Sequence, residues 1–219
     1  MVPLATRSTH ADARLHPSLL LSLPRVATLR RLWHLDLSRC RNITDVGVAT
    51  LATIKHLQRV DLSYCNDITD VGLRTMVTLQ QLQHLDLSCC SKITDFGLRN
   101  IAALRNLQHL SLCVNITDAG LSSIAALQNL HHLSICYCNN LTDAGLACVA
   151  TLIQLQELEL GGCSNSTVGL ATIMTLQNLQ YLGLSDCNKI TDVGLEPIVA
   201  LQQLQTLDLS GCSKITDAS

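Results

Sequence analysis

The sequence predicts an α/β solenoid in which short strands and helices alternate along the chain. The 219 residues include 43 leucines but only five aromatic residues, which is typical of a repeated aliphatic packing unit. A Leu-x-x-Leu-x-Leu segment, with Val or Ile replacing one Leu in two copies, recurs at intervals of 23 to 25 residues. Its eight copies begin at Leu32, Leu57, Leu82, Leu107, Leu130, Leu155, Leu179 and Leu204.

Each repeat is predicted to begin with a short strand. In residues 34–38, His-Leu-Asp-Leu-Ser, apolar and polar residues alternate. Successive side chains of a strand point to opposite faces, so Leu35 and Leu37 are expected to lie on one face and His34, Asp36 and Ser38 on the other. One face of every strand is therefore predicted to be buried, and the other to be exposed.

Each strand is predicted to be followed by a helix that starts at a Thr-Asp-x-Gly motif. In the first repeat Thr44 is the expected N-cap, and Asp45 lies in the first turn, where its charge suits the helix dipole. The helix is expected to run over residues 46–54. Its buried stripe is predicted to consist of Val48, Leu51 and Ile54.

The motif's glycine falls inside the first helical turn, where its backbone freedom makes it destabilising. It recurs at Gly47, Gly72, Gly97, Gly120, Gly145, Gly169 and Gly194. A residue type that is unfavourable at this position but recurs seven times predicts close approach of the neighbouring repeat.

Stacked repeats solve a problem that one repeat cannot, because 25 residues cannot bury their own apolar face. Over about 190 residues the chain follows the pattern L-x-x-L-x-L-x-x-C-x-x-I-T-D-x-G-L, for example from Leu57 to Leu73. It thereby resembles the leucine-rich repeat family, specifically its cysteine-containing subclass. The resemblance implies a horseshoe-shaped leucine-rich-repeat solenoid with a parallel sheet on the concave face and helices on the convex face.

Three segments are expected along the chain. Residues 1–14 are predicted to be a disordered leader, 15–31 a degenerate half-repeat or N-terminal cap, and 32–219 the leucine-rich-repeat domain, with seven full repeats and a truncated eighth. The sequence stops where the eighth helix would begin, so Leu207, Leu209 and Ile215 are expected to lack a cover. Two interpretations remain open: a fragment of a longer chain, or an uncapped edge through which the protein associates.

The cysteines predict a reducing environment. Seven of the 11 follow the last strand Leu or Ile by three residues and are expected to be buried, reduced thiols that bond a backbone group of the next repeat. They are Cys40, Cys65, Cys90, Cys138, Cys163, Cys187 and Cys212. An odd number of cysteines and the lack of a usable signal peptide favour the cytoplasm, with the nucleus as the alternative.

Composition and charge exclude several classes of function. Only 15% of residues are charged and the net charge is −2, which excludes a mainly disordered chain. No apolar run approaches the roughly 18 residues of a spanning helix, so no membrane contact is expected. Residues 1–41 carry a net charge of +5 and the remainder −7. Because phosphate contacts need a basic surface, nucleic acid is not an expected partner.

The exposed strand positions form columns across the repeats, and these are the predicted binding surface for a protein partner. The first column holds His34, Arg59, His84, His109, His132, Glu157 and Tyr181, and the second holds Asp36, Asp61, Asp86 and Glu159. A position just after the strands holds Tyr64, Tyr137 and Asp186. Tyr is enriched at protein interfaces. Its preference for strands is the alternative explanation of the three tyrosines.

No catalytic residue, cofactor or metal is predicted. His and Asp two positions apart on a strand are separated by about 6.6–6.8 Å, too far for a hydrogen-bonded relay. One alternative is a zinc site made of His109, His132, Cys113 and Cys136, although tetrahedral closure on a flat sheet is awkward. A second hypothesis is that the histidines make a partner contact that responds to pH between about 5.5 and 8.

The sequence therefore predicts a non-catalytic protein–protein interaction scaffold that binds its partner on the concave face. The resemblance adds that proteins of this subclass often recognise substrates for ubiquitin ligases, with an F-box ahead of the repeats. Residues 1–30 are too short and wrongly patterned to be an F-box. The alternative function is a self-associating structural or assembly protein that uses the uncapped C-terminal repeat.

Overall fold

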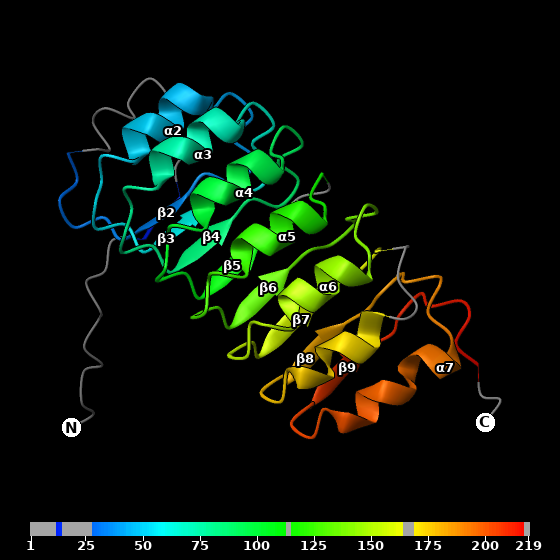
Figure 1. The fold of residues 1–219 in the computed structure, drawn as a ribbon. Coiled ribbons are helices and arrows are strands. Elements are labelled where there is room, and N and C mark those ends of the chain that lie inside the picture. Colours follow the sequence, from blue (N-terminus) through cyan, green and yellow to red (C-terminus); the bar gives the residue numbers. More distant parts are fainter. Residues whose placement is uncertain (1–11, 15–27, 113–114, 164–168, 217–219) are drawn as a thin grey trace, which may run out of the picture.

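The computed structural model describes residues 12–14, 28–112, 115–163 and 169–216. One open sheet of nine parallel strands runs through the molecule in sequence order, and the helices form a second layer beside it (Figure 1). The strands are β1 (Asp12–Arg14), β2 (His34–Asp36), β3 (Arg59–Asp61), β4 (His84–Asp86), β5 (His109–Ser111), β6 (His132–Ser134), β7 (Glu157–Glu159), β8 (Tyr181–Gly183) and β9 (Thr206–Asp208). The predicted solenoid, with its sheet on the concave face and helices on the convex face, is confirmed.

The convex layer is regular at first and then changes. Its elements are α2 (Asp45–Leu51), α3 (Asp70–Met76), α4 (Asp95–Ile101), α5 (Asp118–Ile124), α6 (Asp143–Val149), the 3₁₀ helix η2 (Gly169–Thr175), α7 (Asp192–Leu195) and the 3₁₀ helix η3 (Glu196–Ala200). The first helix starts at Asp45 and ends at Leu51, three residues earlier than predicted. Ile54 is still buried, because a tight turn follows in which its N–H donates to the Leu51 carbonyl.

The core is a continuous stack of aliphatic side chains between the two layers. The inward residue of each strand from β2 to β8 is 0% exposed: Leu35, Val60, Leu85, Leu110, Leu133, Leu158 and Leu182. Val48 and Leu51 of α2 are buried as predicted. In β9, by contrast, Leu207 is 38% exposed, and Leu209 and Ile215 are only half-buried, as the sequence predicts.

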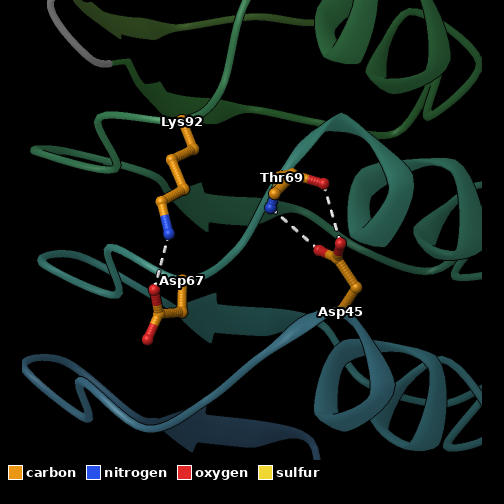
Figure 2. Close-up of polar contacts among 4 residues, drawn as sticks. All are labelled: Asp45, Asp67, Thr69 and Lys92. Atoms are coloured by element: carbon orange, nitrogen blue, oxygen red, sulfur yellow. Dashed lines mark hydrogen bonds and ion pairs between the residues drawn. The ribbon is translucent and has the colours of Figure 1, made fainter.

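A pair of hydrogen bonds joins the start of each regular helix to the next repeat (Figure 2). The Asp45 carboxylate accepts the backbone N–H of Thr69 at 2.8 Å and its hydroxyl at 2.7 Å. Asp70 and Thr94 make the same pair of bonds at 2.9 and 2.7 Å. The sequence suggested only a helix-dipole role for this Asp, but the structure shows that it links repeats. We call these bonds the Asp–Thr ladder; its pairs are Asp45–Thr69, Asp70–Thr94, Asp95–Thr117, Asp118–Thr142 and Asp192–Thr216.

The ladder explains the motif's glycine. A Cβ on Gly72 would lie 2.5 Å from Oδ1 of Asp45, and one on Gly97 would lie equally close to Oδ1 of Asp70. No side chain fits at that distance. The predicted close approach is therefore confirmed at these two positions, and the approaching group is the ladder carboxylate.

The cysteine column also links repeats, but in the opposite direction to the prediction. The Cys65 thiol donates to the carbonyl of Leu37 at 3.2 Å, and that of Cys90 donates to Leu62 at 3.1 Å. The acceptor is thus the last strand residue of the preceding repeat. Burial raises the pKa of Cys65 to about 12, so this thiol remains protonated and can donate. The described cysteines are all free.

The N-terminal end differs from the prediction at one place. Asp12–Arg14, inside the expected disordered leader, form β1 and pair in parallel with β2. The prediction is wrong for these three residues, because the open edge of β2 offers backbone hydrogen bonds to any segment that reaches it. Residues 1–11 and 15–27 lie outside the described residues. Among those described, no helix has the length and apolar character to cross a bilayer.

Candidate functional site

The predicted columns are real rows on the concave face. Strand pairing sets His84 opposite His109 and His109 opposite His132, while Glu157 lies between His132 and Tyr181. The second column is in register as well, with Asp36, Asp61 and Asp86 on neighbouring strands. None of the fourteen predicted partner-binding residues is buried in the core.

Three histidines in the middle of the first column form a stack. The ring centroids of His84 and His109 are 5.2 Å apart, and those of His109 and His132 are 5.6 Å apart. Nδ1 of His132 lies 2.8 Å from Oε2 of Glu157, which ends the stack at β7. Stacking at this distance removes water from the rings and brings together groups that would repel one another if charged.

The stack changes the pH hypothesis. Desolvation, assisted by the positive charge of Arg59 and the neighbouring histidines, lowers the pKa of His84 to about 4. Desolvation also lowers the pKa of His109. His84 is therefore almost entirely neutral between pH 5.5 and 8. A response to pH in that window cannot come from this residue.

The aspartates of the second column have a structural role besides their exposure. Oδ1 of Asp61 accepts the backbone N–H of Ser63 at 2.8 Å, and Oδ1 of Asp86 accepts that of Ser88 at the same distance. Each carboxylate thus satisfies a backbone donor where the strand ends. No hydrogen bond joins His84 to Asp86 in the described part of the chain, and this agrees with the argument that the spacing forbids a catalytic relay.

The tyrosines after the strands are in turns, not in strands. Tyr64 and Tyr137 have φ values of 61°, in the left-handed region, which is uncommon for residues other than glycine. Gly162 and Gly211 hold the equivalent position in two other repeats. Strand propensity, the alternative explanation of the tyrosines, therefore does not apply to these two. Their side chains are 44% and 57% exposed.

The C-terminal part of the concave face has a different character. Gly183 and Gly161 remove the side chains from two exposed column positions. A Cβ on Gly183 would lie 3.1 Å from Cε1 and the hydroxyl of Tyr181 and 3.5 Å from Cγ of Glu159. The Tyr181 ring therefore leans over Gly183 beside Glu159. We call Glu157, Glu159, Tyr181 and Asp208 the β7–β9 cluster.

The zinc alternative finds no support. No group of three or more His, Cys, Asp or Glu side chains within the described ranges is arranged to bind a metal ion. Cys136 lies 3.4 Å from Oγ of Ser134 and 3.9 Å from a Glu159 oxygen. Cys113, the fourth proposed ligand, lies outside the described residues.

A second polar surface was missed by the sequence argument. A hollow of about 370 Å³ lies where the chain enters the strands. It is lined by Gln58, Gln81, Gln83, Asn106, Gln108, Asn129 and His131. The signal was available, because Gln58, Gln83 and Gln108 recur at one repeat position, but amides next to a strand also serve backbone hydrogen bonding.

Comparison with known proteins agrees with this geometry. Models of the leucine-rich repeat match residues 32–52, 53–77, 78–102 and 104–125, and a model of two leucine-rich repeat copies matches 177–219. The chain belongs to the leucine-rich repeat family. The finer assignment to a cysteine-containing subclass stays a prediction. No curated protein sequence gives a significant match.

Two similar crystal structures are internalins of Listeria monocytogenes. An internalin C2 (inlC2) is 24% identical, covers 89% of this leucine-rich repeat chain and 93% of its own, and has a TM-score of 0.61. An internalin (inlF) is 23% identical, covers 90% and 70%, and has a TM-score of 0.54. At such identities the likeness concerns the fold alone.

Proposed function

We propose that the protein is a non-catalytic scaffold that binds another protein on its concave face. One observation carries the proposal: the concave face presents columns of exposed polar and aromatic residues on a backbone held rigid by three inter-repeat features, the sheet, the Asp–Thr ladder and the cysteine thiols. A rigid surface binds with little loss of conformational entropy. Membership of the leucine-rich repeat family, whose members generally bind proteins, supports the same conclusion.

The test compares two substitutions of equal size in one repeat. Ser111→Trp places a bulky neutral side chain at the end of β5 on the concave face, whereas Ala119→Trp places it on the exposed side of α5. Proteins captured from a cell extract by the wild-type chain should be lost with S111W and kept with A119W. Circular dichroism verifies that both variants fold. Equal capture by all three chains would contradict the proposal.

Two finer elements belong to the same proposal. The resemblance to cysteine-containing repeats favours a role in recognising substrates for a ubiquitin ligase, and ligase subunits should then be found among the captured proteins. The reduced thiols favour the cytoplasm, with the nucleus as the alternative. Microscopy of a fluorescent fusion tests the compartment.

Self-association is the second candidate, and the exposure of Leu207 favours it. The equivalent residues Leu158 and Leu182 are 0% exposed, so an apolar surface is left open at β9. Sedimentation of the wild-type chain and of Leu207→Lys distinguishes the two candidates. A concentration-dependent oligomer that L207K abolishes supports self-association, and a monomer at all concentrations excludes it.

A further inference from the structure

The charge of the concave face is uneven. From Leu155 to Cys163, Leu179 to Cys187 and Leu204 to Cys212, the last three strands and their turns contain no Lys or Arg. These segments nevertheless carry Glu157, Glu159, Asp186 and Asp208, a charge of −4. Among the described residues, the one ion pair that reaches this group comes from His132, which pairs with Glu157. The C-terminal part of the face is therefore uniformly negative.

The two glutamates are the carboxylates most available to a ligand. Asp208 already accepts the backbone N–H of Ser210 at 2.9 Å and its hydroxyl at 2.6 Å. Glu159, by contrast, receives only the weak thiol contact of Cys136 at 3.9 Å. The side chain of Glu157 is 54% exposed. A cation that reaches this surface meets these two side chains first.

The glycines and Tyr181 give the negative surface a shape. Gly161 and Gly183 lower the floor, since the other repeats have Ser, Asp, Glu or Cys at these exposed positions. The Tyr181 ring lies over Gly183 next to Glu159. Desolvation, followed by the charge of Glu159 and Asp208, raises the pKa of Tyr181, which locates the negative potential at the ring. An aromatic ring beside carboxylates is a favourable environment for a Lys or Arg side chain.

We infer that the protein partner presents a basic segment whose Lys or Arg side chain binds at the β7–β9 cluster, between Glu157, Glu159 and the ring of Tyr181. The inference rests on the proposed function and adds the chemical class of the partner. It follows from charge complementarity on an unpartnered sheet face. Complementary charge of this kind sets specificity and the rate of association.

The experiment selects peptides from a random library on phage against the wild-type chain. Peptides that bind should be enriched in Lys and Arg over the starting library, and synthetic copies should bind about tenfold more weakly to the double variant Glu157→Gln, Glu159→Gln. The matched control is Asp67→Asn with Glu196→Gln, which removes two exposed carboxylates elsewhere and should change affinity less than about twofold. Tyr181→Leu should cost a further factor of about two to five if the ring binds the cation.

The possible failures differ from one another. Peptides that the concave S111W variant no longer binds, but that lack basic residues or ignore E157Q/E159Q, overturn the inference and leave the proposed function standing. Basic peptides that the control variant weakens equally also overturn it, because such binding depends only on net charge. If neither S111W nor E157Q/E159Q affects any selected peptide, the proposed function fails together with the inference.

Discussion

The repeats from α2 to α6 and those from β7 to η3 share one sheet but differ in their convex layer. The first group has five α-helices of seven residues each, whereas the second has two 3₁₀ helices and the four-residue α7. Strand pairing is unaffected, since β7, β8 and β9 stay in parallel register. The sheet therefore tolerates variation on the opposite side of the core, and the concave surface keeps its geometry.

The Asp–Thr ladder explains the difference. Where an Asp from the preceding repeat accepts the Thr hydroxyl, as at Thr69 and Thr94, the Thr oxygen is oriented to accept an N–H of its own helix. Thr44 and Thr191 make no such cap bond. No Thr-Asp-x-Gly motif precedes Thr44, and the repeat before Thr191 has Thr167 where the others have Asp. Helix capping in one repeat thus depends on the carboxylate of another.

Packing also weakens where the two regions meet. A small apolar cavity of about 20 Å³ lies between α6 and η2, lined among others by Leu146, Leu170 and Leu184. The loss of one residue in the preceding repeat, whose length is 24 instead of 25, accompanies this change. A void of this kind removes dispersion contacts from the residues that line it. The regular region is expected to be the more stable of the two.

The largest expected effect is that of a methyl group at the ladder. Gly97→Ala places a Cβ 2.5 Å from Oδ1 of Asp70, so the ladder has to open and the free energy of unfolding should fall by about 2–3 kcal/mol. The control is Gly194→Ala in α7, where the preceding repeat has no ladder Asp. Because Ala favours helices, this change should stay within about 0.5 kcal/mol of wild type. Urea denaturation measures both, and equal losses would refute the ladder's role.

Removal of the carboxylate itself should have the next largest effect. Asp70→Ala leaves the N–H and hydroxyl of Thr94 without their charged acceptor, at a cost of about 2 kcal/mol. Asp192→Ala removes the same bonds to Thr216 at the exposed end of the ladder, so water replaces them and the loss should be below about 1 kcal/mol. Thermal denaturation of both variants tests the ranking. A larger loss for D192A would reverse the comparison between the two regions.

Acid should weaken the regular region through its histidines. His84 has a lowered pKa of about 4 in the folded protein against 6.5 when unfolded, so the unfolded chain binds the proton first. Stability is fully present above pH 6.5 and falls as the pH decreases towards 4, by about 1–2 kcal/mol after screening by solvent. Hydrogen exchange should increase at β4 and β5 before β7 and β8. His84→Gln should remove part of this pH dependence, and an unchanged profile would contradict it.

Much of the fold was predictable because the repeat is regular. The strand positions, the helix starts, the buried Leu and Cys columns and the glycine contact followed from residues that recur at one spacing. The end of α2 was less predictable, since Ile54 is buried both in a continuing helix and in the turn that exists. The direction of the Cys65 bond was also not predictable, because a thiol between two repeats has an acceptor available on either side.

The candidate site was predictable as a set of positions, and the interactions within it were not. Alternation along the strands was sufficient to place His84, Asp86 and Glu157 on one face. It did not reveal that the histidines stack, that Asp86 caps the end of its own strand, or that Tyr137 lies in a left-handed turn. Each of these depends on a distance or dihedral angle that residue spacing alone does not specify.

The sequence by itself determined the architecture: with a period near 25 residues and aliphatic side chains at fixed places, stacking is the only way to bury the apolar face of each repeat. The tertiary structure decided how neighbouring repeats bond and which polar groups remain available to a partner. Asp45 bonds to Thr69, 24 residues away, and the pKa of His84 falls because other strands cover it. Such interactions arise between groups that only folding brings together, so their strength depends on burial and geometry that the sequence does not state.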